Sequence, residues 1–104
     1  MSRYRVQARA AHRIDEIYDY THATWGEAQA ERYVRALFAR FEAIAARQIP
    51  WRPIPADFGV EGYVGHYEQH VIYWKVLANG DLGIVTVLHE RMHQIERLRE
   101  DFGA

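Results

Sequence analysis

The sequence predicts an α+β fold with an N-terminal strand and an antiparallel helical hairpin packed on a mainly antiparallel sheet. The last three strands are expected to form a meander, and a short C-terminal helix or tail follows them. Apolar residues recur at helical spacing through residues 10–48, short apolar segments follow residue 60, and Asn79-Gly80 separates two of these segments. A chain of 104 residues with 49% apolar side chains forms one domain and can bury a core.

The first half of the chain predicts one strand and two helices. Residues 3–8 alternate polar and apolar side chains, as a half-buried strand does. Residues 10–25 and 27–48 each place apolar residues on one helical face. Because Gly26 alone separates them, they should form an antiparallel hairpin, with Gly26 ending the first helix in the left-handed conformation. The two faces are Ile14, Ile17, Tyr18, Thr21 and Trp25, and then Ala30, Val34, Leu37, Phe38, Phe41, Ile44 and Ala45.

A proline-rich connection leads from the helices to the predicted sheet. Pro50, Pro53 and Pro55 cannot continue a helix. Trp51 and Ile54, which lie between them, are expected to fold back onto the core. Residues 62–67 then predict a weak strand, which the step at residues 68–69 turns into the next one.

Asn79-Gly80 predicts a tight hairpin, because a two-residue type I′ turn needs positive φ at both central positions. The turn fixes the register of residues 69–92 and therefore the two faces of the hairpin. The expected pairs are Val71 with Leu88, Tyr73 with Thr86, Lys75 with Ile84, Leu77 with Leu82, His70 with His89, Ile72 with Val87, Trp74 with Val85 and Val76 with Gly83. The side chains expected to face the core are Ile72, Trp74, Val76, Val85 and Val87.

The opposite face of this hairpin is expected to be only partly covered, which suggests a partner chain. It carries Tyr73, Lys75, Ile84, Thr86 and Leu88. After it, Met92, Ile95 and Leu98 predict a short C-terminal helix. Three apolar positions are too few to stabilise such a helix alone, so it should dock on the sheet or on a partner.

The composition excludes several classes of function. Without cysteine, the chain has no disulfide framework, no thiolate zinc site and no cysteine nucleophile. The formal net charge of −1 argues against direct DNA binding by this chain alone. No apolar run reaches the length of a membrane span and the N-terminus lacks an apolar signal core, so we expect a cytoplasmic protein that does not enter the membrane.

Segments spread over most of the chain resemble the ParE branch of the ParE/RelE toxin superfamily. The segment that ends the last strand is the most specific, because V-L-H-x-R-M is similar to the ParE signature. The matching segments are Ala10-Ala11, Ile14 to Tyr18, Trp25-Gly26, Ala30 with Tyr33 and Leu37, Gly62-Tyr63, His70 to Val76, and Ile84 to Met92.

The resemblance implies a small toxin of a bacterial type II toxin–antitoxin system. ParE-like toxins act on DNA gyrase, and an antitoxin neutralises such toxins by wrapping the helical hairpin and the sheet. No catalytic residue and no cofactor are then expected. The residues expected to bind the target are His89, Arg91, Met92, His93, Arg97 and Leu98. Those expected to bind the antitoxin are Ile17, Tyr33, Leu37, Phe41, Tyr73, Ile84 and Leu88.

Two alternatives remain within the same resemblance. RelE-like relatives cut messenger RNA on the ribosome, which without metal needs an acid, a base and cations. Here the candidates are His89, Arg91, Lys75 and Tyr73, a thin set for holding phosphate. ParE relatives commonly carry arginines before the main hairpin, where this chain has residues 64–66, Val-Gly-His. A degenerate toxin that only binds its antitoxin and represses the operon with it is therefore the other alternative.

Four histidines raise the question of a metal site, because zinc accepts imidazole nitrogen. The predicted register places His70 opposite His89, and His66 and His93 each lie four residues from one of them. That spacing brings ligands together only on a helix, which neither segment predicts. We therefore expect no metal, and we expect His89 to bond the backbone of the C-terminal segment.

Overall fold

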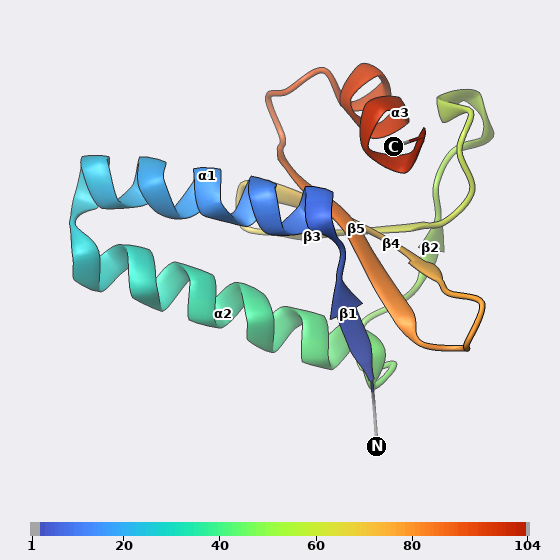
Figure 1. The fold of residues 1–104 in the computed structure, drawn as a ribbon, viewed down its shortest axis with the longest axis horizontal. Helices are drawn as coiled ribbons and strands as arrows, with labels where there is room; N and C mark the ends of the chain where they lie inside the picture. Colours follow the sequence, from blue (N-terminus) through green and yellow to red (C-terminus); the bar gives the residue numbers. More distant parts are fainter. Residues whose placement is uncertain (1–2, 104) are drawn as a thin grey trace.

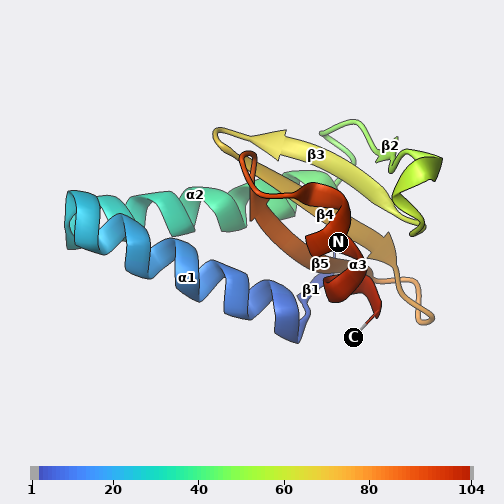
Figure 2. The same cartoon turned by 90° about the horizontal axis from the view of Figure 1, so that it is seen from above.

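The computed structural model describes residues 3–103 and has the predicted α+β fold (Figure 1). Helices α1 (Ala8–Trp25) and α2 (Glu27–Ala45) form an antiparallel hairpin whose far end extends beyond the sheet (Figures 1 and 2). Helix α3 (Gln94–Gly103) follows the last strand. None of the helices in the described chain is long and apolar enough to cross a membrane.

The sheet has five strands in the order β1-β5-β4-β3-β2. Strand β1 pairs with β5 in parallel, and the other pairs are antiparallel, so the last three strands form the predicted meander. The short edge strand β2 was not predicted, because it contains only two residues and one is proline, which the edge of a sheet tolerates. The strands are β1 (Tyr4–Val6), β2 (Arg52–Pro53), β3 (Tyr63–Tyr67), β4 (His70–Val76) and β5 (Leu82–His89), and a 3-10 turn, η1 (Ala56–Phe58), follows β2.

Two helix ends differ from the prediction. Gly26 has φ 98° and ψ 170°, so it is not left-handed helical as expected, although its positive φ still requires glycine. Helix α2 ends at Ala45 rather than at residue 48, because Arg47 adopts φ 62°. The N–H of Gln48 then donates to the carbonyl of Ala43, and the N–H of Arg47 donates to that of Ile44, which is a Schellman motif.

The loop between β4 and β5 is longer than predicted, so the strand pairs next to it differ from the predicted pairs. Only Gly80 of the expected turn has positive φ, and the N–H of Leu77 donates to the carbonyl of Asp81 at 2.8 Å. The loop therefore has three residues, and the expected type I′ turn is wrong. Trp74 pairs with Ile84 instead of Val85, and the pairs expected for residues 75–77 are wrong in the same way.

A bulge at Val85 restores the predicted register at the far end of the hairpin. There Tyr73 pairs with Thr86, and the pairs continue as expected to His70 with His89. Ile72, Trp74 and Val87 pack under the helical hairpin as predicted, together with Ile84. Val76 does not reach this core; it lies at the strand end and is 51% exposed.

The expectation of a partly open sheet face is wrong, because this chain covers that face itself. Helix α3 and residues 54–60 form a second core there, and Leu98 is fully buried in it. Tyr73 and Leu88 lie in this second core, and Thr86 on the same face is also buried. The C-terminal helix therefore docks on the sheet, which was one of the two predicted possibilities.

Candidate functional site

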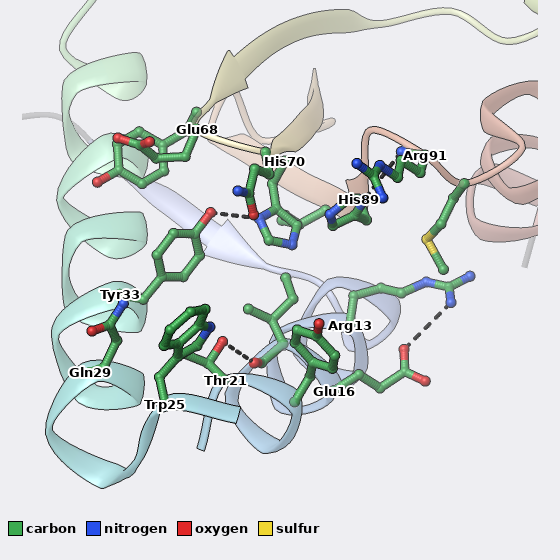
Figure 3. Close-up of a pocket in the computed structure, with 16 residues that line it drawn as sticks. Arg13, Glu16, Thr21, Trp25, Gln29, Tyr33, Glu68, His70, His89 and Arg91 are labelled. Atoms are coloured by element: carbon green, nitrogen blue, oxygen red, sulfur yellow. Dashed lines mark hydrogen bonds and ion pairs between the residues drawn. The ribbon is translucent and has the colours of Figure 1, made fainter. Parts of the chain in front are cut away.

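A groove of about 730 Å³ lies between the helical hairpin and the end of the sheet where His70 pairs with His89 (Figure 3). Helix α1 supplies one wall, α2 supplies two residues, and strands β3, β4 and β5 with the turns after β3 and β5 supply the rest. The lining residues are Arg13, Glu16, Ile17, Tyr20, Thr21, Trp25, Gln29, Tyr33, Tyr67, Glu68, Gln69, His70, Val87, His89, Arg91 and Met92.

The α1 wall of the groove combines apolar and aromatic side chains. Its lining residues recur at intervals of three and four, so they share one face of the helix. Because the hairpin extends beyond the sheet, Tyr20 is 70% exposed and Trp25 is 65% exposed. The groove is therefore a partly apolar surface with no other part of the described chain packed over these two rings.

His70 and Tyr33 form a partly buried polar pair where the groove meets the sheet. Nδ1 of His70 and the hydroxyl of Tyr33 share a hydrogen bond of 2.5 Å (Figure 3). Burial, and secondarily the nearby His89, lowers the pKa of His70 to about 4. Burial also raises the pKa of the Tyr33 hydroxyl. Both groups are therefore neutral near pH 7, and Tyr33 is not activated as a nucleophile.

His89 helps to shape the turn that follows β5. Its Nδ1 accepts a hydrogen bond from the backbone N–H of Arg91 at 3.1 Å, so the imidazole does bond the C-terminal backbone. The centre of its ring lies 5.3 Å from the centre of the His70 ring, and the two ring planes make an angle of 82°. Within residues 3–103, no three histidine or acidic side chains come close enough to hold a metal ion.

The residues expected to bind a target differ in how far they are exposed to solvent. Arg91 and His93 are exposed on the turn, and Met92 is half-buried beside them. Arg97 is exposed on α3 and lies 3.8 Å from Glu100. Leu98 is fully buried in the second core, so its expected place on a binding surface is wrong.

The residues expected to bind an antitoxin also divide by burial. Ile17 and Tyr33 line the groove and are half-buried. The other five are core residues whose side chains are not available at the surface of this chain, because they are buried between the helical hairpin and the sheet or under α3. They are Leu37, Phe41, Tyr73, Ile84 and Leu88.

The four candidate ribonuclease residues do not converge. The hydroxyl of Tyr73 is bonded to Gln94 under α3, and burial raises the pKa of Tyr73 to about 12. The ammonium of Lys75 lies 5.8 Å from the ring centre of Phe102, also on the α3 side. His89 and Arg91 instead line the groove on the hairpin side.

Several side chains that organise the site were not predicted. Arg13 reaches Asp101 of α3 at 3.1 Å, and Gln94 bonds the turn after β5. These contacts leave no periodic signal in the sequence, since Asp101 lies 88 residues from Arg13. The groove face of α1 did leave a signal, because Arg13, Glu16 and Tyr20 recur at helical spacing beside the core face.

Comparison with known families and proteins agrees with this fold. The model of the family described as ParE toxin of type II toxin-antitoxin system, parDE, matches residues 4–94. Toxin ParE1 of Mycobacterium tuberculosis is 34% identical over 92 residues, which cover 88% of this chain and 92% of the relative. Toxin ParE of Escherichia coli is 29% identical over 100 residues, with 96% of each chain covered.

A second curated relative and a solved structure extend the comparison. Toxin ParE1 of Caulobacter vibrioides is 33% identical over 94 residues, which cover 89% of this chain and 94% of the relative. The solved structure described as the chromosomal ParDE TA system from P. aeruginosa aligns with a TM-score of 0.66 at 20% identity. It covers 86% of this chain and 96% of its own, and at that identity it supports the fold alone.

Proposed function

This chain belongs to the ParE family of toxins of type II toxin–antitoxin systems, and we propose that it inhibits growth by binding DNA gyrase and is neutralised by a cognate antitoxin protein. The observation that carries the proposal is a fixed, exposed turn beside an accessible groove. The turn would meet the target, and the groove would receive the antitoxin. The proposed target works on DNA inside the cell, so the proposal places the chain in the cytoplasm.

The turn after β5 has the properties of a surface that binds a protein. Arg91 and His93 are exposed there, next to half-buried Met92. Arginine and methionine are enriched in protein–protein interfaces. An inhibitor that acts by binding needs an exposed surface of fixed geometry and no convergent acid and base, and the exposed turn supports the proposal on this ground.

The geometry weighs against the ribonuclease alternative. Metal-independent cleavage of RNA needs its acid, base and cations around one phosphate. Tyr73 and Lys75 contact α3, whereas His89 and Arg91 line the groove on the other side of the sheet. The net charge of −1 also gives little support to direct binding of DNA or RNA by this chain alone.

The groove supports the proposal of an antitoxin partner. An amphipathic helix that binds in a groove needs apolar anchor sites along its length. Ile17, Tyr33 and the exposed ring of Trp25 provide such sites on the hairpin wall. The antitoxin would thus bind the hairpin and the strand ends, and it would not contact the residues buried under α3.

The gyrase proposal is tested with the purified chain and purified gyrase. We expect the wild-type chain to inhibit supercoiling and to accumulate cleaved gyrase–DNA complexes. Arg91→Ala combined with His89→Gln should weaken inhibition by about tenfold or more, because hot-spot residues carry most of the energy of an interface. Arg52→Ala is the matched control, since Arg52 is an exposed arginine on the far edge strand.

The same test separates the alternatives. Induction of the chain alone, followed by cleavage of messenger RNA at the ribosome with gyrase unaffected, would contradict the gyrase proposal and support the RelE-like mechanism. Induction without any effect on growth would support the degenerate toxin, which binds only its antitoxin. Equal loss of inhibition in Arg52→Ala would show that charge in general, and not the turn, accounts for binding.

A further inference from the structure

The turn that follows β5 is fixed by its own backbone and by the adjacent turn. The N–H of Met92 donates to the carbonyl of His89 at 3.0 Å, which closes the turn. The N–H of Arg91 donates to His89 Nδ1 at 3.1 Å. The N–H of Glu90 donates to the carbonyl of Gln69 at 2.8 Å, which ties it to the β3–β4 connection. Three consecutive amides are thus bonded although this segment lies at the surface.

The side chain of Gln94 adds further bonds from the inner side of the turn. Its Nε2 donates to the carbonyl of His89 at 2.8 Å and to that of Met92 at 3.0 Å. Its Oε1 accepts the hydroxyl of Tyr73 at 2.7 Å. The side-chain amide of Gln94 therefore connects both ends of the turn to the buried side chain of Tyr73 in β4. The side chains of Tyr73 and Gln94 are termed the clasp.

Packing alone does not account for the clasp. Tyr73 is 2% exposed, and phenylalanine would fill the same space without a hydroxyl that needs a partner. The amide oxygen of Gln94 accepts a hydrogen bond from Tyr73, and its amide nitrogen donates two hydrogen bonds to the turn. Such supporting hydrogen bonds are what a binding site requires when its geometry must be held closely.

We propose that the clasp positions the turn His89–Met92, so that Arg91 and His93 are presented in the geometry that growth inhibition requires. The inference rests on the proposed function in one respect, which is the assignment of the turn to target binding. Tyr73 and Gln94 are positioning residues, because they act through the backbone of the turn. Neither clasp residue lines the groove itself, although His89, Arg91 and Met92 of the turn do.

Two substitutions in the full chain test the proposal. Tyr73→Phe removes one hydroxyl and keeps the ring that fills the core. Gln94→Glu keeps an oxygen for Tyr73 but removes the donor that holds the two carbonyls. We expect both to speed hydrogen exchange at the amides of Arg91 and Met92 by about tenfold or more. We also expect both to reduce killing, counted as viable cells after induction without antitoxin, by about tenfold or more.

Thr86→Val is the matched control for loss of a buried hydroxyl. Thr86 is paired with Tyr73, and its hydroxyl also bonds α3, but at Asp101 and away from the turn. This variant should leave the exchange of the turn amides and the killing unchanged, even where its melting temperature falls. A purely structural role for Tyr73 would instead make Tyr73→Phe and Thr86→Val behave alike.

Three results would overturn the proposal: faster exchange in the turn with undiminished killing, reduced killing with unchanged exchange, and equal loss of killing in Thr86→Val. A wild-type chain that kills without inhibiting gyrase would refute the proposed target only, because viable counts do not depend on which target is bound. A wild-type chain that does not affect growth would overturn both the proposed function and the role of the clasp.

Discussion

The carboxylate of Asp101 is fully buried and joins three elements through two partners. It accepts the hydroxyl of Thr86 at 2.6 Å and two guanidinium bonds from Arg13, at 3.1 and 3.3 Å. Removal of one member of a buried ion pair leaves the other charge without compensation, which costs about 3 kcal/mol or more. We therefore expect Asp101→Ala to lower the free energy of unfolding by about 3 kcal/mol, measured by urea titration.

The adjacent residue of α3 provides the control for Asp101. Glu100 is exposed and lies 3.8 Å from Arg97, a surface pair worth less than about 1 kcal/mol. Glu100→Ala should therefore change the free energy of unfolding only slightly. Equal losses in the two variants would show that negative charge on α3, and not the buried bonds of Asp101, stabilises the docked helix.

His70 should make the fold sensitive to mild acid. Its pKa is about 4 in the folded chain and near 6.5 when unfolded, so between these values the unfolded chain binds more protons. Stability from neutral His70 is thus present above pH 6.5 and is lost as the pH falls toward 4. At 1.36 kcal/mol per pKa unit, the loss accumulated by pH 4 is on the order of 3 kcal/mol.

The measurement is the melting temperature between pH 7 and pH 4 for the wild-type chain and for His70→Gln. The substitution should flatten the fall over this range, because glutamine does not titrate. The pKa of the imidazole is also influenced by the neighbouring His89 and Glu90, so His89→Gln is the comparison. An unchanged slope in His70→Gln would assign the acid sensitivity to other groups.

At the scale of elements, the junction of the helical hairpin depends on backbone conformation alone. Gly26 has φ 98° and ψ 170°, a region that essentially only glycine occupies. A Cβ placed there would have no atom within 4 Å, so alanine would not clash with any neighbour. We therefore expect Gly26→Ala to cost about 1 to 3 kcal/mol from strain, and to lower the melting temperature by at least about 4 °C.

Gly103 supplies the comparison for this prediction. Its Cβ would also meet open space, but its φ lies outside the strained range. Gly103→Ala should leave the melting temperature unchanged or raise it slightly, because alanine has the higher helix propensity. A similar fall in both variants would contradict the assignment of strain to the junction.

The β4–β5 hairpin shows why part of its register was predictable and part was not. Asn-Gly suits a two-residue turn, but the same glycine serves in a three-residue loop, where Asn79 accepts the N–H of Asp81 through its side chain. The longer loop shifts the pairing by one residue, and the bulge at Val85 shifts it back. The longer loop and the bulge shift the register in opposite directions, so the expected pairing of His70 with His89 is confirmed. No local sequence pattern predicts either shift.

At the scale of the molecule, periodic patterns predicted the elements but not how the last of them is held. The helical hairpin and the meander followed from spacing, because each buries a continuous apolar face. The docking of α3 depends on polar contacts of Asp101 and Gln94 with residues distant in sequence, and such contacts are not periodic. Tyr73, Ile84 and Leu88 were expected at an open face, but α3 covers Tyr73 and Leu88, and the bulge places Ile84 in the core under the helical hairpin.

The length of the hairpin relative to the sheet determines the last prediction. Because α1 and α2 extend past the strands, Trp25 at the junction is 65% exposed and borders the groove (Figure 3). If the cognate antitoxin fills the groove, its helix buries this ring, and buried tryptophans are among the residues that contribute most to binding. Trp25→Ala should then weaken antitoxin binding by about thirtyfold or more, which corresponds to about 2 kcal/mol.

Isothermal titration of the wild-type chain and its variants with the cognate antitoxin measures this effect. Val76→Ala is the control, because Val76 is 51% exposed but does not line the groove. Neither substitution should move the melting temperature much, since both side chains are largely in solvent. Killing by Trp25→Ala without antitoxin should equal that of the wild type, while rescue by the antitoxin should require more of it. Unchanged affinity in Trp25→Ala would place the antitoxin away from the hairpin end of the groove, and the turn after β5 would then have to serve both partners.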